Sequence, residues 1–438
     1  MLDIMMFREK PDVIRKSEKD RFKDPKTVDQ VIDLDRKWRE SLQKVEKLKQ
    51  QRNEVTREIA ELKKHKKPAG QKINEMKKVN DEIRKTDELT KELLSKRDIL
   101  RYKVGNIIGK DVPVGNSEGQ NKLIRFWGTP SLADASHSKE MPKGMKTRAM
   151  GFVPKSHVDM LVSMDLGDVE KAARVSGSRF YYLKNELVML NLALIRFAMD
   201  TLSKEGFVPV WTPYMLNKEA IAAAAELSDF EEMLYKIQDE EMFLIATSEQ
   251  TLAAYHMNEM FEESDLPKAY AGFSTNFRRE AGAHGKDTKG IFRVHQFDKV
   301  EQYVFCRPED SKEWFGKMIG NAEKIFRALE IPYRVMAICS GEMNDNAAIK
   351  YDLEAWMPAQ GKFREVVSCS NCTDYQARKL GLRFTRNGEK IVPHTLNSTA
   401  VATERVLVAI MENFQQKDGS IRIPKALVPY TGFNTIKR

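Results

Sequence analysis

The sequence predicts an α+β protein in which an N-terminal antiparallel helical hairpin, a coiled coil, precedes an antiparallel β-sheet flanked by helices. Two apolar repeats with helical spacing occupy residues 31–107, and the remainder shows more hairpin patterns than regular strand–helix alternation. The chain has 438 residues, which exceeds the usual size of one domain. We therefore expect a helical arm over residues 1–112 and a second domain over residues 113–438.

The arm begins with a long helix over residues 31–62. Its two seam positions, which recur every seven residues, are apolar except at Ser41 and Arg52. Residues 66–70 end this helix, because they contain a proline and a glycine. A second stripe over residues 76–107 predicts another long helix. Neither stripe is wide enough to bury a globular core, so we expect the two helices, each about 50 Å long, to pack on each other.

The exposed faces of the arm are basic. Residues 36–67 hold twelve Lys or Arg against five acids, and the whole chain has a net charge of +9. Such a stripe suits a track for RNA phosphates, and a net positive charge suggests an anionic partner. A solvated coiled coil or a dimerisation arm would carry similar charge runs, so the pattern leaves these alternatives open.

Cysteine usage and the apolar runs indicate a soluble cytoplasmic protein without membrane contact. Four cysteines are too few for a disulfide scaffold in a chain of this length. The N-terminus reaches the charged Arg8 too soon for a signal peptide. The longest apolar-rich run, residues 187–199, contains Asn191 and Arg196 and is too short to cross a bilayer.

The second domain mixes helices and strands. Glycine, proline and serine become more frequent past Pro113, which marks the boundary. Thr247 followed by an acid is a helix-start signature. The predicted elements are a helix over residues 183–204, a proline-interrupted strand over 207–213, a strand over 241–245, a helix from 247, strand-like segments over 275–280, 291–301, 303–305 and 363–368, and a helix over 402–414.

The hairpin around the polar loop 281–290 is the strongest candidate site in this domain. Its first strand ends in Arg278-Arg279-Glu280, and its second strand alternates apolar and polar residues up to Glu301. Guanidiniums and carboxylates on a rigid hairpin could hold a polyphosphate and read a base. A charged surface hairpin would show the same pattern.

Other signals point to no site. The segment 282–287 is too short for a phosphate-binding loop, and its Lys286 is followed by Asp instead of Ser or Thr. Cys369 and Cys372 form half of a zinc site, but the chain has no second pair, so we expect no zinc. The histidines show neither metal-ligand spacing nor a nucleophile partner.

Several segments, in the expected order, resemble the class II aminoacyl-tRNA synthetases and specifically the seryl-tRNA synthetases. The basic helical hairpin is similar to the N-terminal arm of that family. The other matching segments are residues 206–213 (motif 1), 277–280 with 293–301 (motif 2 in its seryl form), 400–405 (motif 3), 247–249 (the Thr-x-Glu loop), 365–372, and 396–400, which is more similar to archaeal than to bacterial members.

This resemblance implies a class II synthetase-like catalytic domain and a two-step reaction. L-Serine and ATP would form seryl-adenylate, and the seryl group would pass to the 3′-hydroxyl of the terminal adenosine of tRNA(Ser), and of tRNA(Sec) where that tRNA exists. Mg²⁺ is the implied metal, with Glu365 and Ser368 as ligands. The implied assembly is a homodimer, with motif 1 at its interface and the arm contacting tRNA bound to the other subunit.

The same resemblance assigns site residues. The implied catalytic residues are Arg278, Arg293 and Arg405. The implied ATP-binding residues are Arg278, Arg279, Glu280, Val294, Phe297, Glu365, Val366, Val367, Ser368 and Arg405. The implied serine-binding residues are Thr247, Ser248, Glu249, Arg278, Glu301 and Thr399. The implied tRNA-binding residues are Arg36, Lys44, Lys47, Lys63, Lys64, Lys66 and Lys67.

The family pattern also implies individual roles. Arg278 would contact the α-phosphate, and Glu280 would accept from the adenine amino group. Phe297 and Arg405 would enclose the adenine, and Arg293 and Arg405 would lie near the γ-phosphate. Val294, Phe297 and Thr399 could instead be ordinary packing residues. We expect the loop 281–290 to be mobile and to face the tRNA acceptor end.

Two other functions fit parts of the pattern. A synthetase relative could load an amino acid onto a carrier protein, but the arm would then have no evident purpose. A coiled-coil RNA-binding or scaffold protein with a decayed active site would not need the charged set of motifs 2 and 3. Serine-dependent exchange of pyrophosphate with ATP, followed by charging of total tRNA, separates the three.

Overall fold

The chain divides into two compact units, residues 1–107 and residues 108–438. The structure is a computed structural model that describes residues 1–225, 233–281, 287 and 289–437. The sequence pattern places the boundary slightly later, at residue 112. The difference arises because Ile108 and Val112 pack against Met336 and Met343 of the second unit, so this stretch belongs to its core.

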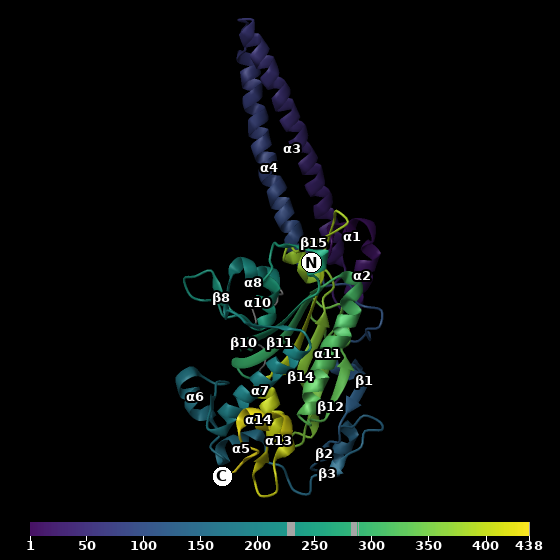
Figure 1. Ribbon diagram of the computed structural model, residues 1–438. Coiled ribbons are helices and arrows are strands. Elements are labelled where there is room, and N and C mark those ends of the chain that lie inside the picture. Colours follow the sequence, from purple (N-terminus) through teal and green to yellow (C-terminus); the bar gives the residue numbers. More distant parts are fainter. Residues whose placement is uncertain (226–232, 282–286, 288, 438) are drawn as a thin grey trace. The chain divides into compact units, whose positions relative to one another are not determined.

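The first unit is helical. Its helices are α1 (Ile4–Glu9), α2 (Pro11–Asp20), α3 (Lys26–Lys64) and α4 (Gly70–Tyr102). Helices α3 and α4 run side by side (Figure 1), and the ion pairs Lys44–Glu82 (2.8 Å) and Lys72–Glu58 (2.7 Å) show that they are antiparallel. The predicted helical hairpin is therefore confirmed, with the turn at residues 65–69.

The polar seam position Ser41 has a structural explanation. Its hydroxyl lies 2.7 Å from the Thr90 hydroxyl, which itself donates to the carbonyl of Thr86 at 2.7 Å. These buried hydroxyls are paired across the seam, so the break in the apolar pattern costs little. The seam residues Val45 and Val55 are buried, as the repeat predicts.

The second unit is built on an eight-stranded sheet with the order β1-β12-β13-β14-β17-β11-β10-β6. All neighbouring pairs are antiparallel except β10 and β6, which are parallel. The strands are β1 (Lys122–Trp127), β6 (Val208–Trp211), β10 (Lys268–Phe277), β11 (Gln296–Cys306), β12 (Tyr333–Ala337), β13 (Ile349–Met357), β14 (Lys362–Asn371) and β17 (His394–Ala402).

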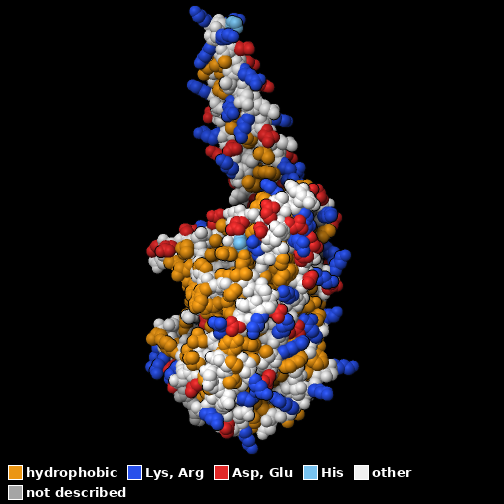
Figure 2. Space-filling view, in the orientation of Figure 1, with side chains coloured by type: hydrophobic (Ala, Val, Ile, Leu, Met, Phe, Trp, Pro, Cys, Tyr) orange, Lys and Arg blue, Asp and Glu red, His pale blue; other side chains and the backbone are white. Residues whose placement is uncertain are grey.

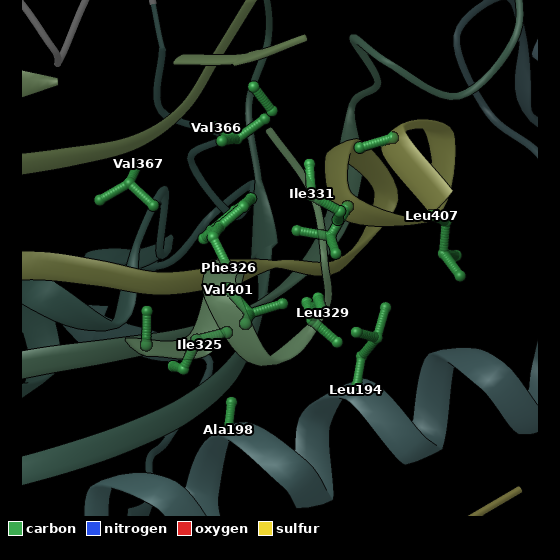
Figure 3. Packing of buried hydrophobic residues seen from close by; sticks show 14 of the residues in the cluster. Leu194, Ala198, Ile325, Phe326, Leu329, Ile331, Val366, Val367, Val401 and Leu407 are labelled. Carbon is green, nitrogen blue, oxygen red and sulfur yellow. The ribbon is translucent and has the colours of Figure 1, made fainter. Parts of the chain in front are cut away.

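Three long helices cover one face of this sheet: α7 (Glu186–Lys204), α11 (Ser311–Ala328) and α13 (Thr403–Phe414) (Figure 1). Figure 3 shows Leu194, Phe326 and Leu407 of these helices in one cluster with Val367 and Val401 of the sheet, and all five are buried. This cluster is the main core of the unit. It fixes the strands that carry the site on their other face.

Shorter elements complete the unit. Helix α10 (Ser248–Ala254) packs on β10 and β11. Among the described residues the others are α5 (His157–Ser163), α6 (Val169–Ser176), α8 (Lys218–Ala224), α12 (Tyr375–Lys379), α14 (Val428–Thr431), β2 (Ser131–Leu132), β3 (Arg148–Ala149), β4 (Gly167–Asp168), β5 (Tyr182–Leu183), β7 (Met215–Asn217), β8 (Met242–Leu244), β9 (Met260–Glu262), β15 (Arg383–Arg386), β16 (Glu389–Ile391), β18 (Ile421–Arg422) and β19 (Thr435–Ile436), with short 3₁₀ turns between some of them.

The α+β class and the antiparallel sheet with flanking helices are confirmed. The strand-like segment 303–305 is the second half of β11 and not a separate strand. Helix α11 and strands β12 and β13 have no counterpart among the predicted elements. Within the described part of the chain, no helix is long and apolar enough to cross a membrane.

Candidate active site

A cavity of about 470 Å³ opens on the face of the sheet opposite the three long helices. Strand β11 explains the placement: Val300 and Val304 point into the main core, and the alternating Phe297, Lys299 and Glu301 line the cavity. Its other lining residues are Ala224, Ala225, Met233, Thr247, Glu249, Gln250, Arg278, Glu280, Phe292, Arg293, Val294, Asn344, Asn346, Lys350, Glu365, Val366, Ser368, Ser370, Asn397, Thr399, Ala402, Glu404 and Arg405.

Arg278 follows the last residue of β10, and the hairpin holds it rigidly. Its amide donates to the carbonyl of His295 at 2.8 Å, which extends the β10–β11 ladder by one residue. Its Nε donates to the carbonyl of Ala246 at 3.1 Å, and its guanidinium carbon lies 5.0 Å from the centre of the Phe297 ring. The guanidinium is thus fixed from two sides while it faces the cavity.

Glu280 and Arg293 form an ion pair across the open end of the hairpin, in which Arg293 Nε donates to a Glu280 oxygen. Glu280 has a positive φ of 49°, so the chain turns sharply here and directs this side chain to the cavity. The two residues were predicted to contact opposite ends of ATP. In the structure they contact each other.

Arg405 lies in the first turn of α13 and lines the cavity. Its Nη1 donates to the backbone carbonyl of Glu365 at 3.0 Å and lies 3.4 Å from the Glu365 carboxylate. Its guanidinium carbon is 5.2 Å from the centre of the Phe292 ring, whose distance to the Arg364 guanidinium carbon is 4.0 Å. Phe292 therefore supports Arg405, a role that the sequence patterns did not reveal.

Glu404 anchors the start of α13 below the cavity. Its carboxyl accepts from the amide of Asp298 at 3.0 and 3.1 Å, and from the hydroxyls of Tyr181 and Thr403. Burial raises the pKa of Glu404 to about 8, and the nearby carboxylate of Asp298 adds to the shift. This buried carboxyl ties α13 to strand β11 and so sets the position of Arg405.

Carboxylates gather where β13 and β14 meet. Burial alone would raise the pKa of Glu365, but the cations of Arg405, Lys350 and Arg278 outweigh it and lower that pKa. Asp352 pairs in register with Ser368 on the neighbouring strand. Burial raises the pKa of Asp352 to about 7, with Lys350 opposing the shift and Glu365 adding to it.

Asp352 was missed by the sequence analysis. Its Oδ1 is buried and has no hydrogen-bond partner among the described residues. It lines a second cavity of about 450 Å³ beside the first, and the two cavities share Phe292, Arg293, Lys350, Glu365 and Arg405. A carboxylate oxygen with no partner, next to Glu365 and Ser368, is suited to a cation.

The other end of the cavity holds a linked polar group of four side chains, three of them buried and one, Thr247, half-buried. Lys299 Nζ lies 2.6 Å from the Thr247 hydroxyl and 2.8 Å from a Glu301 oxygen, and the Thr399 hydroxyl donates to the same oxygen at 3.2 Å. Thr247 is also the N-cap of α10, where its side chain accepts from the amide of Glu249. Lys299 was missed, although the alternation of β11 places it between Phe297 and Glu301.

Glu249 is held by two amides. Its Oε1 accepts from Gln376 Nε2 at 3.1 Å and from Asn397 Nδ2 at 3.0 Å. Gln376 is in turn fixed by the Tyr303 hydroxyl, which donates to its Oε1 at 2.6 Å. These supporting residues come from α12, β17 and β11, so no local motif marks them.

Most predicted site residues therefore meet in one cavity, but three do not line it. Arg279 is exposed outside it, and its amide donates to the carbonyl of Met233. Val367 points into the opposite core (Figure 3). Ser248 is buried and its hydroxyl donates to the carbonyl of Gly272 at 3.4 Å. Val366 belongs to the same buried cluster but also borders the cavity, together with Glu365 and Ser368.

The structure of the loop 281–290 is described only in part. The expectation that it is mobile and faces the tRNA acceptor end falls largely on residues 282–286 and 288, which lie outside the described residues. The described Asp287 pairs with Arg364, whose Nη1 lies 3.1 Å from Asp287 Oδ1.

All four cysteines are buried and free, and burial raises the pKa of Cys369 to about 12. In the described ranges, no three or more His, Cys, Asp or Glu residues form a group that could hold a metal ion by themselves.

On the arm, all seven predicted tRNA-binding residues are exposed. Arg36 pairs with Asp33 at 2.8 Å and Glu40 at 3.0 Å, and Lys44 pairs with Glu82. Among the described residues, no acid lies within ion-pair distance of the others, which are Lys47, Lys63, Lys64, Lys66 and Lys67. Figure 2 shows blue basic side chains along the whole arm, with acidic ones between them.

Two family models match the chain. The one described as the seryl-tRNA synthetase N-terminal domain matches residues 1–108, and the class II tRNA synthetase core domain (G, H, P, S and T) matches residues 233–414. The serine–tRNA ligase of Thermococcus sibiricus is 48% identical over 443 residues, which cover 100% of this chain and 97% of the relative.

Two solved structures are also similar over the whole chain. Seryl-tRNA synthetase from Pyrococcus horikoshii, complexed with ATP, is 47% identical with a TM-score of 0.93. The cytoplasmic serine–tRNA ligase from Naegleria fowleri, in complex with AMP, is 40% identical with a TM-score of 0.85. Each match covers 100% of this chain and 99% of the other. The expected similarity to archaeal members is confirmed by the Thermococcus and Pyrococcus proteins.

Proposed function

This chain belongs to the seryl-tRNA synthetase family, and we propose that it activates L-serine with ATP and transfers the seryl group to tRNA(Ser). The observation that carries the proposal is the convergence of Arg278, Glu280 and Arg405 with the buried group around Glu301 in a single cavity. The first set suits a nucleoside triphosphate, and the second suits a small polar amino acid.

The adenine would lie between the Phe297 ring and the Arg405 guanidinium, which face the cavity from β11 and α13. Stacking on an aromatic ring and on a planar cation stabilises a purine on both faces. Glu280 would accept a hydrogen bond from the adenine amino group, which distinguishes ATP from GTP. Arg293 would then leave Glu280 and contact the γ-phosphate, so ATP would replace their ion pair with two charge-assisted contacts.

The reaction itself needs charge neutralisation and alignment more than a protein nucleophile. The serine carboxylate attacks the α-phosphorus, a P–O bond forms, and the bond to the pyrophosphate oxygen breaks. Negative charge increases on the α-phosphate oxygens in the transition state, where a preorganised guanidinium is most effective. Arg278 is suited to this role because Ala246 and Phe297 already hold it in place.

The serine would lie at the end of the cavity that contains Thr247, Glu249, Glu301 and Thr399. Carboxylates there can accept from the substrate ammonium and hydroxyl groups. Alanine and glycine would leave these buried acceptors unpaired, which is a strong basis for rejection.

Mg²⁺ is the expected metal, and the donor set fits it. The Glu365 carboxylate and Ser368 hydroxyl line the cavity, and the unpartnered oxygen of Asp352 lies on the adjoining strand. Mg²⁺ usually takes one or two protein oxygens and completes its shell with water and phosphate oxygens. When bound, it would neutralise charge on the triphosphate. The low pKa of Glu365 keeps that ligand ionised at neutral pH.

The helical arm would bind tRNA, with tRNA(Sec) as a further substrate where it exists. Helical RNA is recognised mainly by shape and phosphate contacts. The tip lysines, Lys63, Lys64, Lys66 and Lys67, have no acidic partner among the described residues and would contact phosphates at no cost in broken ion pairs. Arg36 and Lys44 would first have to leave Asp33, Glu40 and Glu82.

A homodimer is supported by exposed apolar side chains around motif 1. Trp211 on the edge strand β6 is 75% exposed, and Val208, Met189 and Leu192 beside it are also exposed. Figure 2 shows a broad hydrophobic area on this face of the second unit. An apolar sheet edge of this kind is suited to pairing with a second copy of the chain.

The proposal is tested in two steps. Serine-dependent exchange of labelled pyrophosphate into ATP measures activation, and charging of total tRNA with labelled serine measures transfer. Absence of serine-dependent exchange in the folded wild-type protein would overturn the proposal. Exchange without charging would favour an acceptor other than tRNA.

A further inference from the structure

Lys299 is a buried cation inside the cavity. It lies in the segment 293–301 that resembles motif 2, but it was not among the predicted site residues. Its side chain is almost inaccessible (the residue is 6% exposed), and Glu301 beside it is 2% exposed. The ammonium nitrogen lies 2.8 Å from a Glu301 oxygen on the same strand and 2.6 Å from the Thr247 hydroxyl. Lys299 thus joins β11 to the N-cap of α10.

This arrangement brings a basic and an acidic side chain, both buried, into direct contact. A carboxylate removed from water is costly unless a cation and hydrogen bonds compensate it. Lys299 and the Thr399 hydroxyl both contact the same Glu301 oxygen, Oε2. The second oxygen of Glu301 is then oriented by the plane of the carboxylate.

Lys299 also has donor capacity left over. An ammonium group has three N–H bonds. Among the described residues, its acceptors are the Thr247 hydroxyl and Glu301, which leaves one N–H bond for the cavity that Lys299 lines. A bound hydroxyl next to Glu301 can accept from that N–H bond while it donates to the carboxylate.

We propose that Lys299 is a specificity-determining residue for the amino acid. It keeps Glu301 and Thr247 in position and donates its remaining N–H bond to the hydroxyl oxygen of the substrate serine. This inference rests on the proposed function, since it assigns a role within the serine site. Discrimination follows, because alanine offers no hydroxyl and leaves both the Lys299 donor and the Glu301 acceptor unpaired.

Amino acids other than serine would lose different hydrogen bonds at Lys299 and Glu301. Alanine and glycine lose both hydrogen bonds, whereas cysteine offers a thiol that is a weak donor and a weak acceptor. Loss of Lys299 should therefore reduce the preference for serine over alanine and over cysteine. Binding of ATP at the other end of the cavity should change little.

The test uses the full-length chain with two substitutions at this position. Lys299→Met removes the charge at similar length. Lys299→Cys can be alkylated with 2-bromoethylamine, which restores an ammonium group on a side chain of nearly the same length. The four native cysteines are buried, and wild-type protein treated in the same way controls for their reaction.

Gln302→Met is the matched control. Gln302 lies three residues after Lys299 on β11, is fully buried, and points away from the cavity, where its Nε2 donates to the carbonyl of Met318 at 3.0 Å. It tests whether a methionine in this buried strand harms activity through the fold alone. Circular dichroism and thermal unfolding check that all variants fold.

Pyrophosphate exchange measures three quantities. These are the KM for serine, the KM for ATP, and the serine preference, defined as kcat/KM for serine divided by kcat/KM for alanine. For Lys299→Met we expect the KM for serine to rise about 30-fold or more, the KM for ATP to change less than about threefold, and the serine preference to fall at least about tenfold. Alkylation of Lys299→Cys should recover most of both losses.

The inference would be overturned if Lys299→Met kept the wild-type KM for serine and the wild-type preference for serine. It would also be overturned if Lys299→Met raised the KM for serine and the KM for ATP equally and to the same extent as Gln302→Met. If Lys299→Met fails to fold, the comparison of Lys299→Cys before and after alkylation decides. Failure of the proposed function is distinguishable, because the wild-type protein would then show no serine-dependent exchange.

Discussion

Arg293 donates a hydrogen bond to Glu280 across the open end of the β10–β11 hairpin, so the two ends of the proposed ATP site are joined directly. The pair links the residue assigned to adenine with one assigned to the γ-phosphate. A nucleotide that satisfies both must be bent, so that its last phosphate returns towards the base. The same pair keeps both charges compensated before ATP binds.

Glu280→Gln should weaken base selection more than catalysis. An amide in place of the carboxylate loses the charge-assisted hydrogen bond to the adenine amino group and also frees Arg293. We expect kcat/KM for ATP to fall about tenfold, which corresponds to about 1.4 kcal/mol. Wild type should prefer ATP over purine riboside triphosphate, which lacks the amino group, and the variant should lose that preference. An unchanged preference would contradict the role of Glu280.

Arg278→Ala should lower the rate of seryl-adenylate formation by about two to three orders of magnitude without unfolding the protein. The side chain sits at the proposed α-phosphate position, where charge increases in the transition state. Pyrophosphate exchange measures the rate, and Arg279→Ala is the matched control because Arg279 is the exposed neighbour outside the cavity. Normal exchange by Arg278→Ala would remove this residue from the reaction.

Glu365→Gln should raise the Mg²⁺ concentration needed for half-maximal exchange, by about tenfold or more. An uncharged amide is a poorer ligand for a hard cation than the carboxylate, whose pKa the surrounding arginines lower. Titration of exchange activity with Mg²⁺ in metal-free buffer measures the shift, and EDTA should abolish wild-type activity. Glu342→Gln, an exposed acid at the second cavity, is the control. Equal Mg²⁺ requirements in wild type and Glu365→Gln would rule out this ligand.

The stability of the protein should fall between pH 6 and pH 8 because of Glu404. Its folded-state pKa of about 8 lies above that of an unfolded glutamate, so the folded state binds the extra proton between about pH 4.5 and pH 8. The free energy of unfolding from this group therefore decreases as pH rises, by up to about 1.4 kcal/mol per pH unit. Glu404→Gln, which mimics the neutral form, should show a flatter dependence in urea unfolding at pH 6, 7 and 8. Identical slopes would show that Glu404 does not titrate in this range.

Removal of residues 31–104 and closure with a short Gly-Ser linker should leave serine activation intact and abolish charging of tRNA. The two helices pack on each other, and the described residues that line the cavity lie between residues 224 and 405. A milder variant changes Lys63, Lys64, Lys66 and Lys67 to Glu, which should weaken tRNA binding and reduce its salt dependence. Charging that survives the deletion would make the arm a structural feature only.

Local patterns were sufficient for the arm and for the main hairpin. The heptad spacing predicted α3 and α4. It also showed the polar break at Ser41, although its partner Thr90 is seen only in the structure. The alternation on β11 also places Lys299 on the same side of the strand as Phe297 and Glu301. That pattern was therefore sufficient to predict that Lys299 lines the cavity. Helix α11 and strands β12 and β13 went unpredicted, because no motif drew attention to them.

The sequence by itself determined the two long helices, the α+β class and the identity of most charged residues at the site, because short-range periodicity and motif spacing carry that information. Tertiary structure alone decided which of them meet. Phe292 reaches Arg405 across 113 positions of the chain, and Thr247 reaches Lys299 across 52, through sheet register and the packing of α13 and α10. Contacts of that kind depend on strand register and on side-chain packing throughout the core, and no local sequence pattern encodes either.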